Sequence, residues 1–107
     1  MTPLSPVIPF TSLVHRQSDY IDSRVLAAAT HEAHTVPAAA RYVKMIADVA
    51  FWYEVNGTAA IPAADVTNGT ASSYVPANSA IFVLVTGGGT IGLISAGTPV
   101  ISLEFFE

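Results

Sequence analysis

The feature that most limits the fold of this chain is the regular interruption of its apolar runs by glycine, proline and asparagine. No segment with helical periodicity extends beyond two turns, whereas several segments have the length and composition of short strands. Short strands separated by such turn residues are typical of sandwiches and small barrels. We therefore predict an all-β fold, a small β-sandwich or jelly-roll-like barrel of about six to eight antiparallel strands.

The clearest strand signals lie after residue 40. Strands are predicted at residues 41–47, 51–55, 80–86, 90–95 and 99–106. Because the turn pair Asn56-Gly57 ends the second of them, the first two are predicted to form a hairpin. Glycine-containing turns separate the last three, which are predicted to form a meander. Strand, helix and loop all remain open for residues 11–34, with a strand favoured at residues 25–29.

The start of the chain differs from the rest. Pro3, Pro6 and Pro9 recur at the spacing of a polyproline II helix, and each removes a backbone hydrogen-bond donor. We predict an extended Pro-rich arm over residues 1–20 and a single β-sandwich domain over residues 21–107, since the length suits one domain. Apolar residues of the arm are candidates for binding a partner; a terminus without a partner is the alternative. These residues are Leu4, Val7, Ile8 and Phe10.

Charge is scarce and unevenly distributed. Hydrophobic residues make up 51% of the chain and charged residues 11%, against roughly 25% charged residues in an ordinary soluble domain. A surface so poor in charge favours association, so we predict a homo-oligomer or a larger assembly. Beyond Lys44 the chain has acidic residues but no basic one, which would repel phosphate backbones. We therefore expect no nucleic-acid partner.

Motifs for catalysis, cofactors or metals fail on their context. Gly87, Gly89 and Gly92 have the G-x-G-x-x-G spacing, but a strand follows where a nucleotide site requires a helix. His31 and His34 lie three residues apart, whereas the zinc motif requires four; a surface metal site with His15 remains a minor alternative. We expect no enzymatic activity, no catalytic residue, no metal and no cofactor. No apolar run approaches the ~18 residues of a membrane span, so no membrane partner is expected.

Side-chain alternation along the strands indicates two candidate contact surfaces. The last strand has an apolar core face and a second face that still carries apolar residues, and residues 81–85 are apolar on both faces. The predicted oligomer interface comprises Ile81, Val83, Val85, Val100 and Phe106. The aromatic cluster at residues 51–53 must point to both sides of its strand. Candidates for an exposed aromatic contact are Trp52, Tyr53 and Tyr74.

The order of segments from residue 35 onward resembles a group of small all-β virion proteins encoded near the head genes of tailed bacteriophages. The resemblance lies in residues 35–43, the aromatic strand at residues 51–53, residues 62–70, the glycine turn and the terminal strand. It covers roughly two thirds of the chain.

This resemblance implies a structural virion protein. It implies, within that class, a capsid decoration (cement) protein that binds and stabilises the shell of the major capsid protein. Such a protein would form a homotrimer on the capsid exterior of a virion assembled in the host cytoplasm. The alternative is a binding module of the phage tail, neck or fibre tip that contacts a host glycan or protein.

Overall fold

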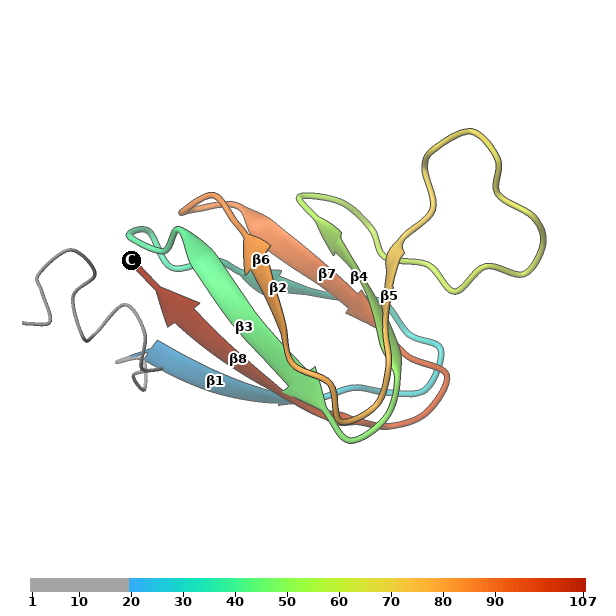
Figure 1. Cartoon of the computed structure of the whole chain (residues 1–107), viewed down its shortest axis with the longest axis horizontal. Helices are drawn as coiled ribbons and strands as arrows, with labels where there is room; N and C mark the ends of the chain where they lie inside the picture. The colour runs from blue at the N-terminus through green and yellow to red at the C-terminus, as the bar shows by residue number, and fades with distance from the viewer. Residues whose placement is uncertain (1–19) are drawn as a thin grey trace, which may run out of the picture.

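The computed structural model describes residues 20–107, which form eight strands and no helix (Figure 1). The strands are β1 (Tyr20–Val25), β2 (Glu32–Thr35), β3 (Tyr42–Ala47), β4 (Phe51–Val55), β5 (Ser73–Val75), β6 (Ile81–Leu84), β7 (Thr90–Ile94) and β8 (Val100–Phe106). The predicted all-β class is confirmed. Of the predicted arm, only Tyr20 belongs to the described residues, and it opens β1.

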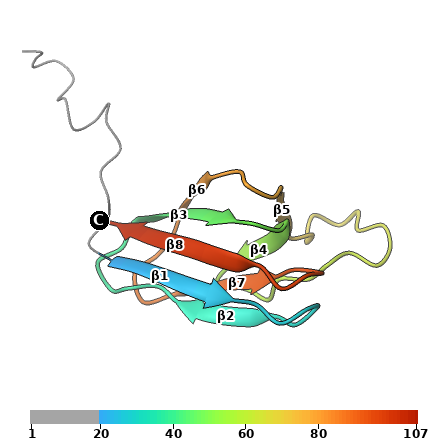
Figure 2. The ribbon, with the colours of Figure 1, turned by 90° about the horizontal axis from the view of Figure 1, so that it is seen from below.

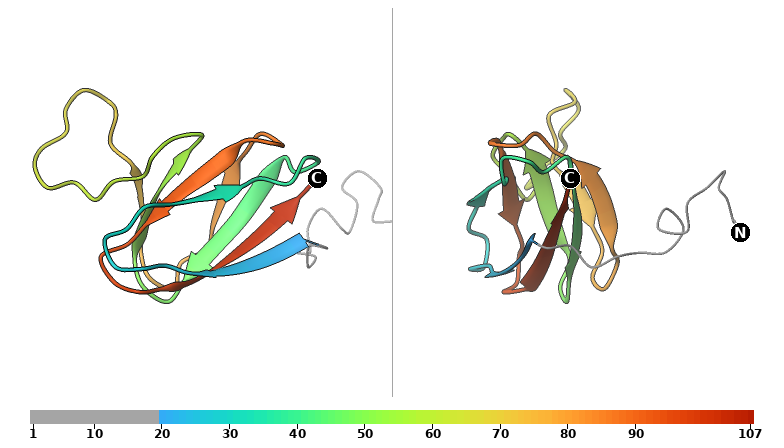
Figure 3. Two further views of the ribbon diagram at one scale, coloured as in Figure 1. Left: turned by 180° about the vertical axis from the view of Figure 1, so that it is seen from behind. Right: turned by 90° about the vertical axis from the view of Figure 1, so that its left-hand side faces the viewer.

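The strands form two antiparallel sheets that pack face to face. Their orders are β1-β8-β3-β6 and β2-β7-β4-β5, and Figure 2 and the right-hand view of Figure 3 show them as separate layers. Successive strands alternate between the sheets, except that β4 pairs with β5. This strand order is that of a jelly roll, one of the two architectures predicted from the sequence.

Two predictions of local pairing are wrong. The strands at residues 42–47 and 51–55 do not form a hairpin, because residues 48–50 carry the chain from one sheet to the other. The last three strands do not form a meander, because β6 and β8 belong to one sheet and β7 to the other. Glycine and asparagine mark where the chain turns, but they do not indicate whether the next strand pairs with the preceding one or crosses the sandwich.

The glycine turn between β6 and β7 shows how tightly such a crossing is made. The amide of Gly89 donates to the carbonyl of Thr86 at 2.9 Å, and Gly88 has a φ of 84°. A Cβ at Gly87 would lie 2.0 Å from the carbonyl oxygen of Ala38. The three glycines therefore serve a tight turn packed against a neighbouring loop, not a phosphate-binding loop.

The core fills the space between the sheets. Alternate residues of the central strands point inward, and those of β8 are the predicted ones: Ile101 and Leu103 are fully buried and Phe105 almost so. The opposite sheet contributes Phe51 and Leu93, which are also fully buried. The core comprises Leu26, Val36, Ala40, Val43, Met45, Ala47, Phe51, Val75, Ile91, Leu93, Ile101, Leu103 and Phe105.

The edge of the sandwich between β1 and β2 is closed by polar bridges. His34 Nε2 lies 2.8 Å from Asp22 Oδ2, and the imidazole stacks on Phe105 with ring centroids 6.0 Å apart. Arg24 Nε donates to Glu32 Oε2, and this hydrogen bond raises the pKa of the guanidinium. Polar residues at a spacing of two in both segments, Asp22 and Arg24 in one and Glu32 and His34 in the other, were the available signal for this pair of strands.

The strand favoured at residues 25–29 is wrong, because β1 ends at Val25 and the following residues turn toward β2. Residues 32–35 form β2, so a strand begins within the segment for which strand, helix and loop remained open. Glu32 and His34 are opposite Leu93 and Ile91 of β7 in the register, so their side chains point between the sheets.

Candidate functional site

The candidate site is the outward surface of the β1-β8-β3-β6 sheet, which we call the outer face. Its residues alternate with those that enter the core, and the strand register aligns them in rows across the four strands. They are Ile21, Ser23 and Val25 of β1, Val100, Ser102, Glu104 and Phe106 of β8, Tyr42, Lys44 and Ile46 of β3, and Phe82 and Leu84 of β6.

Exposed apolar side chains are concentrated on the outer face. Leu84 is 81% exposed, Val25 66%, Phe82 56%, Val100 48% and Ile21 39%, which makes five of the nine large hydrophobic residues exposed within residues 20–107. Single exposed apolar residues are normal on protein surfaces, whereas a contiguous group on one sheet face is a feature of binding sites.

One end of the outer face carries a row of aromatic side chains. The rings of Tyr42 and Phe106 stack with centroids 4.9 Å apart and an interplanar angle of 12°. Tyr42 also lies 6.3 Å from the ring of Phe82, and Leu84 is its direct partner on β6. We call Tyr42, Phe82, Leu84 and Phe106 the aromatic row. Aromatic side chains in contact offer a large, stiff apolar surface at low cost in side-chain entropy.

The outer face has almost no charge. The two charged side chains on its strands, Lys44 and Glu104, are direct partners in the register, with Nζ and Oε1 3.6 Å apart. Both are largely buried, with 23% and 13% of their side chains exposed. Because these two charges offset each other, an apolar partner packed on the four strands would not have to desolvate an isolated ion.

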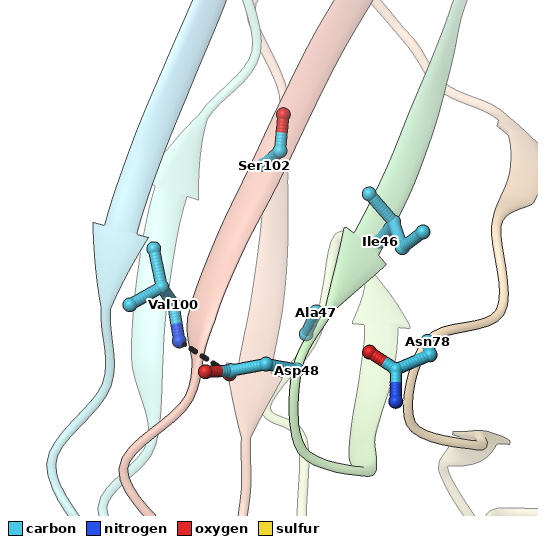
Figure 4. A pocket seen from close by; sticks show the side chains of 6 residues that line it. All are labelled: Ile46, Ala47, Asp48, Asn78, Val100 and Ser102. Carbon is cyan, nitrogen blue, oxygen red and sulfur yellow. Dashed lines mark hydrogen bonds between the residues drawn. The ribbon is translucent and has the colours of Figure 1, made fainter.

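The other end of the outer face is aliphatic and slightly hollowed (Figure 4). The depression has a volume of about 250 Å³ and lies where β3 ends and β8 begins. Its lining consists of Ile46, Ala47, Asp48, Asn78, Val100 and Ser102. Asp48 Oδ1 accepts a hydrogen bond of 3.0 Å from the amide of Val100, and the amide of Asn78 donates to the carbonyl of Ala47. The depression is open and mostly aliphatic, so it suits a bulky apolar side chain.

The structure places the residues of the predicted interface on the two sides of their sheet. Val100 lies on the outer face, and Phe106 belongs to the aromatic row. Ile81, Val83 and Val85 pack against the core instead. The reason is the register, in which Ile81 is paired with Met45 and Val83 with Val43, both of which point inward. The exposed residues of this strand are the intervening Phe82 and Leu84.

The residues of the predicted aromatic contact lie on the opposite sheet. Trp52 and Tyr74 are direct partners on β4 and β5, with ring centroids 5.0 Å apart and Tyr74 55% exposed. Tyr53 points the other way and packs against the core, as the alternation along β4 requires. Beside the pair, Ser72 Oγ donates to Glu54 Oε1 at 3.2 Å. Two aromatic side chains therefore remain as a small second surface.

The connection between β4 and β5 extends away from the sandwich, as Figure 1, Figure 2 and the left-hand view of Figure 3 show. It begins beside His31, one of the histidines that were considered as metal ligands. His31 Nδ1 accepts a hydrogen bond from the amide of Ala59, whereas His34 contacts Asp22. No three potential ligands come together in residues 20–107, and His15 lies outside this range.

The predicted contact residues of the arm, Leu4, Val7, Ile8 and Phe10, lie outside the described residues. Within residues 20–107, no helix is long and apolar enough to cross a membrane. Comparison of the chain with protein-family models, curated proteins and solved structures found no match. Its function is therefore inferred from its residues and from the geometry of the two surfaces.

Proposed function

We propose that this protein is a structural component of a virion, a decoration protein that binds and stabilises the capsid shell of a tailed bacteriophage. The observation that carries the proposal is the outer face, an exposed and mostly apolar sheet surface with an aromatic row at one end and a hollow at the other. Association of such a surface with another protein lowers the free energy, because apolar groups are removed from water. The resemblance of residues 35–107 to small virion proteins supports the capsid as the partner.

The fold is consistent with this role without establishing it. Jelly rolls occur in viral capsid domains and also in lectins and cupins, so these functions are distinguished by the surface residues and not by the fold. An enzyme or small-ligand site normally has an enclosed pocket with convergent polar groups. The hollow of the outer face is open, and Asp48 already accepts a backbone hydrogen bond. Its chemistry favours a protein contact.

The size of the outer face bears on the oligomeric state. Four strands about 4.8 Å apart and about six residues long span a projected area of roughly 400 Å². A standard protein interface buries about 800 Å² on each partner. The outer face of one copy is therefore small for a stable contact. We propose that three copies in a homotrimer bind the shell at the same time, which gives an avidity that a single copy lacks.

The test of this proposal measures the protein in solution and on shells. Light scattering is expected to give a mass of about 34 kDa, three times the 11.2 kDa of one chain. After mixing with empty phage capsids, the protein is expected to sediment with them at a fixed ratio to the major capsid protein. A monomer that stays in the supernatant at all capsid concentrations would exclude the decoration role.

The Trp52–Tyr74 pair supports a second candidate function, a tail or fibre-tip module that binds a host glycan. Exposed aromatic rings stack on sugar faces, and Tyr74 is accessible while Trp52 supports it from the adjacent strand. This candidate predicts that Tyr74→Ala lowers glycan binding at least about tenfold, whereas Tyr74→Phe, which keeps the ring, retains it. The measurement is a glycan array screen followed by titration calorimetry. Wild-type protein that binds no glycan removes this candidate.

A further inference from the structure

An aromatic pair and a carboxylate lie next to each other on the outward surface of the β2-β7-β4-β5 sheet. Trp52 and Glu54 are two residues apart on β4, so their side chains point to the same side, about 7 Å apart along the strand. Tyr74, on the edge strand β5, is the direct partner of Trp52. We call Trp52, Tyr74 and Glu54 the aromatic–acidic corner.

The two rings of the corner present an open aromatic surface. Their centroids are 5.0 Å apart and their planes are inclined by 57°, so the rings of Trp52 and Tyr74 form two walls and not a flat stack. Tyr74 is 55% exposed, because β5 is the last strand of its sheet. The face of an aromatic ring carries partial negative charge and attracts cations.

The carboxylate of the corner is fixed by uncharged neighbours. Ser72 Oγ donates to Glu54 Oε1 at 3.2 Å, and the same hydroxyl accepts a hydrogen bond of 3.0 Å from the amide of Ala60. A Cβ at Gly57 would lie 2.7 Å from Glu54 Cγ, so the stem of the side chain packs closely against this turn. Among residues 20–107, Glu54 has no ion-pair partner. Its negative charge is therefore held beside the two rings without compensation.

The neighbouring His31 does not supply the missing positive charge. Gly92 is the direct partner of Glu54, and a Cβ at Gly92 would lie 2.6 Å from His31 Cε1. His31 Nδ1 accepts a hydrogen bond from the amide of Ala59, so this nitrogen carries no proton and the imidazole is uncharged. The basic residues of the described part of the chain lie on, or directly before, strands of the opposite sheet: Arg24, Arg41 and Lys44.

We infer that the aromatic–acidic corner binds an arginine side chain of a partner protein. The guanidinium lies on the exposed ring of Tyr74 and directs its N–H groups toward the carboxylate of Glu54. Charge complementarity carries the inference, because the corner combines two ring faces with a negative charge that no basic side chain of residues 20–107 offsets. The inference goes beyond the proposed function, since the corner lies on the sheet opposite the outer face.

Arginine suits the corner better than lysine or a neutral sugar. A guanidinium is planar and weakly hydrated, so it stacks on a ring while it donates hydrogen bonds in its own plane. A lysine ammonium is compact and strongly hydrated, and it gains less on a surface as open as that of Tyr74. A neutral sugar can stack on the same rings, but it leaves the charge of Glu54 without an opposite charge.

Trp52 is the only tryptophan of the chain, so its indole N–H resonance reports on the corner. The full chain is titrated with Nα-acetyl-arginine amide and, in parallel, with the citrulline analogue, which has the same shape and no charge. A saturable shift of the indole resonance is expected with the arginine amide, and about tenfold weaker binding with the citrulline analogue. The inference would be overturned by equal affinities, or by the absence of a saturable shift up to about 100 mM arginine amide.

A charge-removing variant tests the part played by the carboxylate. Glu54→Gln keeps an oxygen that can accept the hydrogen bond from Ser72, and it is expected to weaken binding of the arginine amide about fivefold. The matched control is Asp65→Asn, which removes the same charge from an exposed position on the β4–β5 connection and is expected to bind as the wild type does. Equal weakening in the two variants would show that the net charge of the domain attracts the arginine, and would overturn the inference.

The aromatic part of the corner is tested in the same titration. Tyr74→Ala is expected to weaken binding of the arginine amide about tenfold, because it removes the ring that the guanidinium covers. Unchanged affinity of this variant would contradict the inference. Neutral methyl glycosides are titrated as the alternative ligand. Glycosides that shift the Trp52 resonance, together with no shift from the arginine amide, would overturn the arginine site in favour of a sugar.

Discussion

Val25→Glu is expected to weaken binding to capsids roughly 100-fold while leaving the domain folded. Val25 is the last residue of the edge strand β1 and is 66% exposed. It is the direct partner of Val100 at the hollowed end of the outer face. In the free protein a glutamate there remains in water. In a contact with the shell its carboxylate would be buried without a partner, at a cost of about 3 kcal/mol, which corresponds to roughly two orders of magnitude in affinity.

The measurement is the amount of protein that sediments with empty capsids over a range of concentrations, with circular dichroism as the check on folding. The control is Val66→Glu, which places the same charge on the β4–β5 connection, outside the outer face, and is expected to bind as the wild type does. Wild-type affinity of the Val25→Glu variant would mean that the outer face is not the surface that meets the shell.

Ile101→Ala is expected to reduce the free energy of unfolding by about 2–5 kcal/mol, in a domain whose total stability is of the order of 5–15 kcal/mol. Ile101 is fully buried on the central strand β8, so its truncation leaves a cavity between the sheets. The neighbouring Val100→Ala is the matched control, because Val100 points to the outer face and is 48% exposed. Its expected effect is within about 0.5 kcal/mol.

Urea titration distinguishes these two variants. Ile101→Ala is expected to lower the midpoint of unfolding without changing the dependence of the unfolding free energy on urea, whereas Val100→Ala is expected to leave the midpoint almost unchanged. Equal losses of stability at positions 100 and 101 would contradict the assignment of opposite faces to adjacent residues of β8. This comparison also tests the outer face, since a truncation at Val100 that does not affect folding can still reduce capsid binding.

Sequence periodicity predicted strands and faces where polar and apolar residues alternate. In β8, the polar Ser102 and Glu104 separate the inward Ile101, Leu103 and Phe105, so the inward face was determined by local information. β4 was predicted with its observed bounds, because the strand begins with an aromatic run and ends before Asn56, a turn residue whose φ is 55°.

The same reasoning failed where local information is absent. Residues 81–85 are all apolar, so the sequence does not show which of their side chains face the core. Only the register with β3 shows that Phe82 and Leu84 face outward. Periodicity therefore did not distinguish the core-facing Ile81 and Val83 from the outward residues of β6. β2 was missed because its inward side chains, Glu32 and His34, are polar and are compensated by residues of β1 that lie earlier in the sequence.

The position of β8 between β1 and β3 has a consequence for biosynthesis. A nascent chain that has not yet reached residue 100 has β1, β3 and β6 without the strand that joins β1 to the rest of its sheet. The outer face therefore forms only when β8 has left the ribosome and inserted between its two neighbours. Until then only the outward side chains of β3 and β6 lie side by side, and the rows that cross all four strands are incomplete.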